Sequence, residues 1–235
     1  MPSHRQWTKA RYPKLSSKDI TTRMKILTFC PTAPRLEPEV LHSLLNQGGV
    51  QFNDLMLTRD NPYNGENGRV LWNVQLAYEK MRQVVLTQGY AKVWVVESDT
   101  IPPLDALSKL LEVDAPSVSG LYALRRGSMG PNVRKPITRE MFKWDELKPK
   151  WGSTITTAGG CMGCVLLDRS AIEDFCFVDE ANPNAPDVPM MEYHWHKGFK
   201  QVARLDVICG HKQPSGEILW PDREQGYRIE RSTAS

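Results

Sequence analysis

The chain has 235 residues, 40% of them hydrophobic, and a formal net charge of +3. A chain of this length can bury most of its apolar surface without a disulfide framework or a structural metal. No stretch approaches the roughly 18 apolar residues of a membrane span, and no apolar segment follows the N-terminal charges as in a secretory signal. The chain has five cysteines, an odd number, and they are scattered along the sequence rather than arranged as a disulfide framework. We therefore expect free thiols and a cytoplasmic protein.

Basic residues concentrate near the N-terminus. Residues 4–25 are rich in Lys and Arg, contain a single Asp and show little apolar periodicity. We therefore expect residues 1–23 to form a basic arm that is either solvated or in contact with a polyanion. Residues 213–235 are polar with few core signals, so we expect a C-terminal tail and a folded domain that spans residues 24–212.

The first half of the chain alternates between apolar runs and helical periodicities. Short apolar runs predict strands at residues 24–30, 54–58 and 93–96. A helical period with suitable first-turn residues predicts helices at residues 38–47, 69–88 and 103–112. This order predicts an α/β fold with an open, mostly parallel sheet that carries helices on both faces.

The second half contains the same kinds of element in a less regular order. We expect strands at residues 116–124 and 202–208, and a third strand that follows a glycine-rich turn and ends at residue 168. Helices are expected at residues 169–175 and 188–197. Residues 125–153 are a basic excursion that contains aromatic residues. Ligands of open α/β sheets bind beyond the carboxyl ends of the strands. Polar loops follow such ends at residues 31–32, 59–61, 97–99 and 209–211, so we expect them to converge on one site.

The third expected strand ends in two carboxylates. Its apolar run is followed directly by Glu97, Ser98 and Asp99. Carboxylates at such an edge can hold a hard cation. Alternatively, Asp99 or Thr100 caps the helix that is expected to begin near Pro103. The residues by themselves leave both interpretations open.

Four stretches carry a recognisable pattern. VVESDTIPPLDALSKLL has the form of a strand, a DxD motif and a helix, and PSVSGLYALR that of the next strand. TTAGGCMGCVLLDRSAIEDF runs from a glycine-rich loop into a strand and a helix, and DVPMMEYHWHKGFKQVARLDVICGHK from a helix into a closing strand with a histidine. In this order and spacing they resemble small glycosyltransferases of the GT-A fold, close to family 2 and its phage-type relatives, over about residues 24–212.

The resemblance implies a GT-A fold and the metal-dependent, inverting transfer of a sugar from a nucleotide-sugar donor, which we expect to be a UDP-sugar. Asp99 and His211 correspond to metal ligands, and Mn²⁺ or Mg²⁺ would bridge the donor diphosphate. Asp187 corresponds to the general base that takes the proton from the acceptor hydroxyl. Glu192 is the rival base, and capping of the following helix is the alternative role of Asp187.

The resemblance also implies a donor site, with the difference that the first acid of the DxD motif is Glu97. The donor residues would be Pro31, Thr32, Asp60, Arg69, Glu97, Ser98, Tyr122, Gly159 and Gly160. Glu97 would reach the ribose or a metal-bound water, and the two glycines would let the backbone approach the donor sugar or the acceptor. Solvated loop residues and a simple turn before a strand are the alternative interpretations.

The acceptor class stays open in the sequence. The basic arm and the basic, aromatic residues 125–151 make a hydroxylated base in phage DNA a candidate acceptor, beside glycans, lipids and proteins; a viral protein would act in the host cytoplasm. A nucleotidyltransferase on a related fold is a second enzyme hypothesis. It predicts a glycine-rich, Lys-containing loop after the first strand, and CPTAPRLEPE lacks that loop.

A zinc-supported nucleic-acid-binding protein is the alternative from another functional class. Cys161 and Cys164 form a C-x-x-C motif, which also fits a redox pair. A second cysteine pair at zinc spacing is missing, so His194, His196 and Cys209 would have to complete the site.

Overall fold

The computed structural model describes residues 24–31, 36–50, 54–58, 70–125, 129–179 and 185–231. The basic arm and three of the expected donor residues, Thr32, Asp60 and Arg69, lie outside these ranges.

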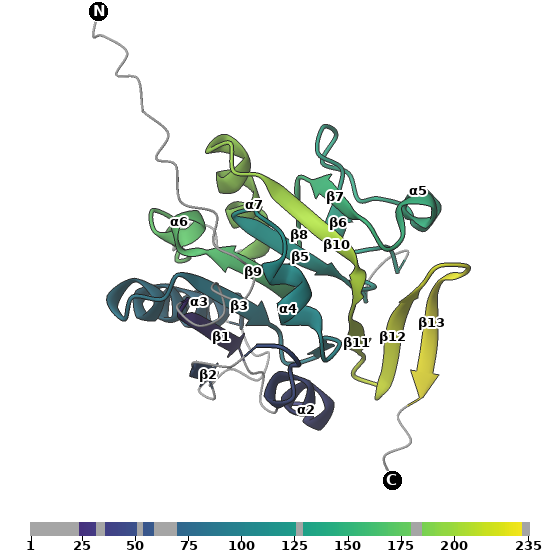
Figure 1. Ribbon diagram of the computed structural model, residues 1–235, viewed down its shortest axis with the longest axis horizontal. Coiled ribbons are helices and arrows are strands. Elements are labelled where there is room, and N and C mark those ends of the chain that lie inside the picture. Colours follow the sequence, from purple (N-terminus) through teal and green to yellow (C-terminus); the bar gives the residue numbers. More distant parts are fainter. Residues whose placement is uncertain are drawn as a thin grey trace, which may run out of the picture.

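A seven-stranded sheet in the order β2-β1-β3-β9-β5-β10-β7 forms the centre of the molecule (Figure 1). Its strands are β1 (Ile26–Pro31), β2 (Asp54–Thr58), β3 (Lys92–Val96), β5 (Ser117–Leu121), β7 (Thr154–Thr157), β9 (Cys164–Asp168) and β10 (Gln201–Ile208). The first three strands and β10 appear close to the positions that the apolar runs predict.

The sheet is mixed, with most of its strands running in one direction as expected and two of them, β7 and β9, reversed. Strand β1 runs parallel to β2 and β3, and β10 runs parallel to β5. Strand β9 is antiparallel to both of its neighbours, and β7 is antiparallel to β10. Between β5 and β9 the chain passes through β7, which ends beside the first residue of β10, and β9 then begins at the opposite end of the sheet.

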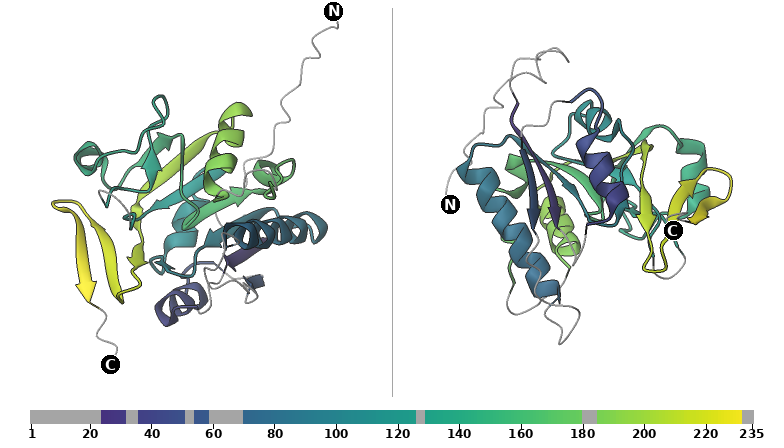
Figure 2. Two further views of the ribbon diagram at one scale, coloured as in Figure 1. Left: turned by 180° about the vertical axis from the view of Figure 1, so that it is seen from behind. Right: turned by 90° about the horizontal axis from the view of Figure 1, so that it is seen from below.

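Helices cover both faces of the sheet, as the alternation of strands and helices predicts. One face carries α2 (Pro38–Leu45) and α4 (Ala106–Leu111), and the other carries α3 (Val70–Thr87), α6 (Arg169–Ile172) and α7 (Asp187–His196) (Figure 2). Successive side chains of a strand point to opposite faces. In β3, Trp94 packs with α2 and α4, whereas Val93 and Val95 pack with α3. A strand buried on both faces is a continuous apolar run.

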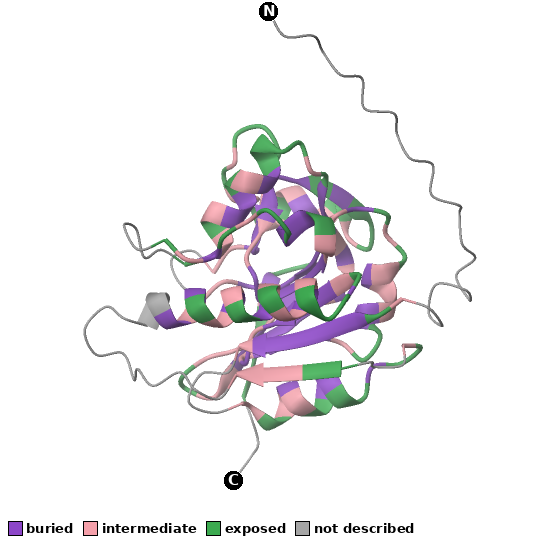
Figure 3. Cartoon of the chain, turned by 90° about the vertical axis from the view of Figure 1, so that its left-hand side faces the viewer, coloured by how far each residue is buried: buried purple, intermediate pink, exposed green. Residues whose placement is uncertain are grey.

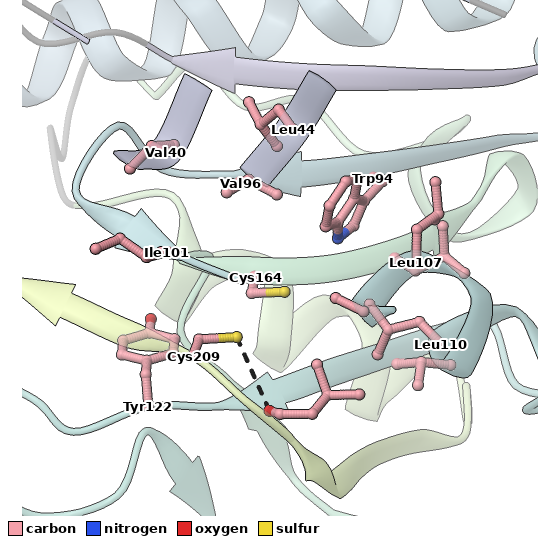
Figure 4. Close-up of a cluster of buried hydrophobic side chains, with 14 of the residues drawn as sticks. Val40, Leu44, Trp94, Val96, Ile101, Leu107, Leu110, Tyr122, Cys164 and Cys209 are labelled. Carbon is pink, nitrogen blue, oxygen red and sulfur yellow. Dashed lines mark hydrogen bonds between the residues drawn. The ribbon is translucent and has the colours of Figure 1, made fainter. Parts of the chain in front are cut away.

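The core is densest around β1 and β3. Figure 3 shows β1 buried along most of its length, whereas the edge strand β2 is exposed to intermediate. Figure 4 shows the cluster in which Trp94 and Leu110 are fully buried between strands and helices. Each such side chain contributes about 1.5–3 kcal/mol relative to an exposed one.

The basic excursion is folded onto the β10 end of the sheet. It contains β6 (Val133–Arg134), α5 (Trp144–Leu147) and η1 (Lys148–Lys150), and β6 pairs with β8 (Gly159–Gly160). Val133 and Leu147 are fully buried and pack against Leu205 of β10. The excursion is therefore an integral layer rather than an irregular loop.

The C-terminal segment forms a hairpin and not the polar tail that its composition predicts. Strands β11 (Gly210–Lys212), β12 (Glu217–Asp222) and β13 (Gly226–Arg231) form a second sheet with β4 (Thr100–Ile101), in the order β13-β12-β11-β4 (Figure 1). Leu219 is buried, and a Cβ on Gly226 would lie 2.7 Å from Cγ of Trp144. Ile218 and Leu219 of β12 are both buried, but β13 is exposed over most of its length, so the segment as a whole has too few apolar residues to stand out in the sequence.

None of the helices in the described part of the chain has the length and apolar character needed to cross a membrane.

Candidate active site at the carboxyl end of β3

The second sheet brings His211 beside Asp99. Strand β11 pairs antiparallel with β4, so that His211 faces Thr100 and Gly210 faces Ile101. The pairing continues where the backbone N–H of Lys212 donates to the carbonyl of Asp99 at 2.8 Å. As a result, Nε2 of His211 lies 3.8 Å from Oδ1 of Asp99.

The surroundings of His211 leave Nε2 as an acceptor. Nδ1 lies 2.7 Å from the carbonyl oxygen of Ala123, and a carbonyl only accepts, so Nδ1 carries the proton. Burial lowers the pKa of His211, although the nearby Asp99 acts in the opposite direction. The ring of Tyr122 packs edge-on against the imidazole, with centroids 5.2 Å apart. The neutral ring is thus held with the Nε2 lone pair near Asp99.

The two oxygens of Asp99 have different surroundings. Oδ2 is paired with Nη2 of Arg125, whereas Oδ1 is buried and has no hydrogen-bond partner among the described residues. Oδ1 and the Nε2 of His211 are therefore two acceptors that face each other without a proton between them. A buried carboxylate oxygen costs free energy unless it is paired, and a hard divalent cation accepts both ligand types. The pair fits such a cation.

Helix capping does not account for Asp99. Helix α4 begins at Ala106, and its N-cap residue is Asp105. Asp99 and Thr100 precede the helix by a strand and two prolines, and Oγ1 of Thr100 has no partner among the described residues. The acidic turn is instead closed by the bond from Thr100 N–H to Glu97 O, at 3.0 Å.

Glu97 lies in an acidic and largely buried environment. Burial raises its pKa to about 8, and the charges of Asp99 and Asp187 contribute in the same direction. The hydroxyl of Tyr78 lies 3.5 Å from Oε1 of Glu97. Three carboxyl groups from β3, its following turn and α7 therefore meet at one place, although Asp187 is distant from the others in the sequence.

Asp187 is the first residue of α7 and points to the same side as the buried face of the helix. Residues three, four and seven positions apart share a helix face, and Met190, Met191 and His194 are buried. The Asp187 carboxylate lies near the Cys161 thiol, and its charge adds to burial in raising the pKa of that thiol. Oδ1 of Asp187 is buried and has no partner in the described part of the chain. The N-cap position belongs to Pro186, so the capping role is not seen.

Glu192 does not face the sheet. Its side chain is exposed, because it lies off the helix face that carries Asp187 and Met191. No contact joins it to the acidic group at the end of β3 among the described residues. Of the two candidate bases, the structure therefore brings only Asp187 to the site.

Tyr122 is buried and supports His211. It is 2% exposed, and its hydroxyl accepts a hydrogen bond from the Gly163 N–H at 3.0 Å. Ser98 is also buried, at 6% exposure. Pro31, at the end of β1, is half-buried. Burial is the reason that Tyr122 serves to hold His211 and cannot present its hydroxyl to a ligand.

The two glycines pack closely against other parts of the protein. Gly159 has φ +124, and a Cβ there would lie 2.5 Å from Cγ of Met191. A Cβ on Gly160 would lie 3.1 Å from Oγ of Ser119. Gly159 therefore allows α7 to pack onto β8, because a side chain there would push the helix away.

Three residues outside the expected site organise it. A Cβ on Gly163 would lie 2.6 Å from Cζ of Tyr122, so only glycine allows that contact. The buried Asn132 accepts from the Tyr122 N–H and donates to the Gly120 carbonyl, both at 3.0 Å. Arg125 pairs with Asp99. No local pattern marks them, since each acts through a partner that is distant in the sequence.

The C-x-x-C motif does not form a thiol pair. Cys164 and Cys209 are both buried in the core, and the Cys209 thiol donates to the Val207 carbonyl at 3.8 Å (Figure 4). Cys161 instead lies at Asp187. The described residues contain no cluster of three or more His, Cys, Asp or Glu side chains suited to a metal. Neither the redox pair nor a zinc site built on these cysteines is present in the described ranges.

Comparison with solved structures shows that this arrangement of sheet and helices occurs elsewhere. No family model and no curated protein matches the sequence of this chain. The crystal structure of A197 from STIV is similar, with a TM-score of 0.60 and 15% identity over 90% of this chain and 97% of that chain. The mixed α/β fold is therefore shared with a known structure.

Two further structures are less similar. One is a putative glucose-1-phosphate thymidylyltransferase from Bacillus anthracis in complex with a sucrose, with a TM-score of 0.47 and 15% identity over 80% of this chain and 89% of that chain. The other is HddC from Yersinia pseudotuberculosis, with a TM-score of 0.34 and 14% identity over 65% of this chain and 80% of that chain.

Proposed function

We propose that the protein is a metal-dependent glycosyltransferase that moves a sugar from a nucleotide-sugar donor, a UDP-sugar, to an acceptor hydroxyl. The observation that carries this proposal is the pair of unpartnered acceptors, Oδ1 of Asp99 and Nε2 of His211, 3.8 Å apart at the end of β3. When bound there, Mn²⁺ or Mg²⁺ would neutralise the charge of the departing diphosphate. Two protein ligands suffice, because such cations take their remaining ligands from substrate phosphates and water.

Asp187 is the proposed general base. The acceptor hydroxyl gives its proton to the Asp187 carboxylate while its oxygen forms a bond to the anomeric carbon of the sugar. The bond from that carbon to the diphosphate oxygen breaks, and the electron pair leaves with the diphosphate. A single displacement of this kind inverts the anomeric configuration. Cys161, beside the Asp187 carboxylate, stays a neutral thiol, because burial raises its pKa to about 12 and the charge of Asp187 adds to the shift.

A hydroxylated base in DNA is the acceptor that we propose. The excursion that precedes β7 is basic, and the Arg139 guanidinium lies 3.8 Å from the ring centroid of Trp195 on α7, the helix that begins at Asp187. Stacked aromatic and guanidinium groups bind nucleobases and phosphates. The test compares transfer to oligonucleotides that contain hydroxymethylated pyrimidines with transfer to unmodified ones. This acceptor would be rejected if the modified and unmodified oligonucleotides received the sugar equally, or not at all, while a glycan or peptide received it.

The proposed function is tested with a panel of nucleotide sugars in the presence of Mn²⁺. We expect one donor to raise the melting temperature of the protein and to be hydrolysed slowly, with water in the place of the acceptor. Asp99→Ala should lose both responses. The proposal is wrong if no donor produces a response in the wild-type protein. Zinc in the purified protein together with no donor hydrolysis would favour the zinc-supported nucleic-acid-binding alternative.

A further inference from the structure

Arg125 holds the carboxylate that the proposed cation would need. It follows β5, and its Nη2 contacts Oδ2 of Asp99 and also donates to the backbone carbonyl of Lys212. The carbonyl of Lys212 belongs to β11, next to His211. A single guanidinium thus touches both halves of the proposed metal site, the DxD turn and the histidine strand.

The guanidinium has donor capacity that the protein does not use. Nε of Arg125 is buried and has no hydrogen-bond partner among the described residues. A buried donor without a partner costs about 1–3 kcal/mol. Arginine presents its donors in a planar fork that matches two phosphate oxygens. In Arg125, Nη2 is bound to a carboxylate and Nε is unpaired. The guanidinium could therefore bind a phosphate, but one of its donors is already used by Asp99.

We propose that Arg125 is the counter-ion of Asp99 in the ligand-free protein and becomes an anchor of the donor diphosphate when a divalent cation binds. This inference rests on the proposed function. A dication at Oδ1 of Asp99 repels the guanidinium on the same carboxylate, whereas a diphosphate attracts both charges. Arg125 therefore exchanges one anionic partner for another and is never left as a lone buried charge.

The exchange couples the binding of cation and nucleotide. Without nucleotide, the cation has to compete with Arg125 for Asp99, so it binds weakly. With nucleotide present, the released guanidinium has a phosphate partner, so the cation binds more tightly. Coupling between two ligands is reciprocal. We therefore expect Mn²⁺ to strengthen UDP binding and UDP to strengthen Mn²⁺ binding by the same factor, about tenfold.

The test measures the affinities of Mn²⁺ alone, UDP alone and each in the presence of the other, by calorimetry and by the electron paramagnetic resonance of free Mn²⁺. Arg125→Met should bind Mn²⁺ alone more tightly than the wild-type protein, bind UDP with Mn²⁺ about tenfold more weakly, and lose most of the coupling. Arg125→Lys keeps the charge without the fork, so its affinity for Mn²⁺ alone should stay close to wild type. Arg228→Met removes an exposed arginine of the C-terminal hairpin and should change nothing.

The outcomes separate this inference from the function on which it rests. Wild-type protein that binds no UDP with Mn²⁺ contradicts the proposed function, and the inference with it. The second outcome is that wild-type protein binds both UDP and Mn²⁺, while Arg125→Met binds Mn²⁺ alone with unchanged or weaker affinity. That result overturns the counter-ion role of Arg125 and leaves the proposed function standing. Thermal unfolding of each variant shows whether an altered affinity comes from a damaged fold.

Discussion

The imidazole of His211 lies 3.8 Å from Oδ1 of Asp99 because two short strands, β4 and β11, pair with each other. The hydrogen bond from Nδ1 to the Ala123 carbonyl fixes which nitrogen faces the carboxylate. Both facing atoms are acceptors, so the contact itself is not a hydrogen bond. This relationship favours the proposed cation site over a helix cap at the end of β3.

Removal of either facing atom should weaken the binding of Mn²⁺. We expect Asp99→Asn and His211→Gln each to lower the affinity for Mn²⁺ in the presence of UDP by roughly 100-fold, because each removes one of two protein ligands. Calorimetry measures the effect. Asp145→Asn, at an exposed position of α5 paired with Lys148, is the control and should bind like wild type. Wild-type affinity in the His211 variant would show that the histidine has a structural role only.

Asp187→Asn and Glu192→Gln should differ sharply in the rate of donor hydrolysis. The first removes the proposed base, so we expect the donor to bind normally while donor hydrolysis slows by roughly 100-fold or more. Glu192→Gln changes an exposed side chain of the same helix and should affect neither donor binding nor donor hydrolysis. Steady-state hydrolysis and donor affinity are measured in parallel. Hydrolysis that depends on Glu192 and not on Asp187 would reverse the assignment.

The reactivity of Cys161 reports its contact with Asp187 without any need for activity. Burial raises the pKa of the Cys161 thiol to about 12, and the charge of Asp187 contributes. Asp187→Asn removes the charge, so the pKa of Cys161 should fall and its alkylation at pH 8 should become faster. Mass spectrometry of iodoacetamide-treated protein measures this against the exposed Cys176. An unchanged rate would place the two side chains apart.

His194 should make the fold sensitive to mild acid. It is fully buried, Nε2 lies 2.8 Å from the Ala171 carbonyl, and burial lowers its pKa below the usual 6.5. The unfolded chain therefore binds the proton first as the pH falls. Stability from this group is complete above pH 6.5 and is lost below it, with a slope of up to about 1.4 kcal/mol per pH unit.

Urea unfolding between pH 7.5 and pH 5 measures that slope. His194→Gln should flatten the dependence of the unfolding free energy on pH, even if it lowers the unfolding free energy at every pH. His196→Gln, at an exposed position of the same helix, should keep the wild-type slope. Equal slopes in the two variants would assign the acid sensitivity to other groups.

Gly163→Ala should disturb the support of His211. The new methyl group would lie 2.6 Å from Cζ of Tyr122 and 2.8 Å from Oγ1 of Thr100. Overpacking of this kind costs about 1–3 kcal/mol. Because Tyr122 packs on His211, the affinity for Mn²⁺ should fall as well. Gly48→Ala is the matched control, since its nearest contact would be an ordinary 3.6 Å. Denaturant unfolding that shows equal costs for both variants would contradict this packing.

Local pattern predicts many of the individual elements. Strand β2 has the predicted bounds, residues 54–58, and α3 lies within one residue of the predicted helix at each end. Each of these elements is predicted by a periodicity within its own segment, which can be recognised without knowing the segments that pack against it. The phase of α7 is also encoded locally, because Asp187 lies three and four residues before the buried Met190 and Met191.

Strand direction and the C-terminal hairpin are not encoded in the same way. An apolar run such as that of β9 predicts a buried strand whichever way the strand runs. Strand β4 is two residues long and followed by prolines, so it carries no periodic signal. Strand β13 of the hairpin is exposed over most of its length, which is why the sequence of this segment predicts a polar tail.

The sequence by itself determined the candidate carboxylates, the candidate histidine and most of the helices and strands, because these follow from residue type and local periodicity. Only the tertiary structure decided which of these residues meet. Asp99 reaches His211 through the β4–β11 pair, Asp187 reaches Glu97 through the packing of α7 on β8, and Arg125 occupies Asp99. Contacts between distant segments depend on how the sheet closes, and a local pattern carries no information about that closure.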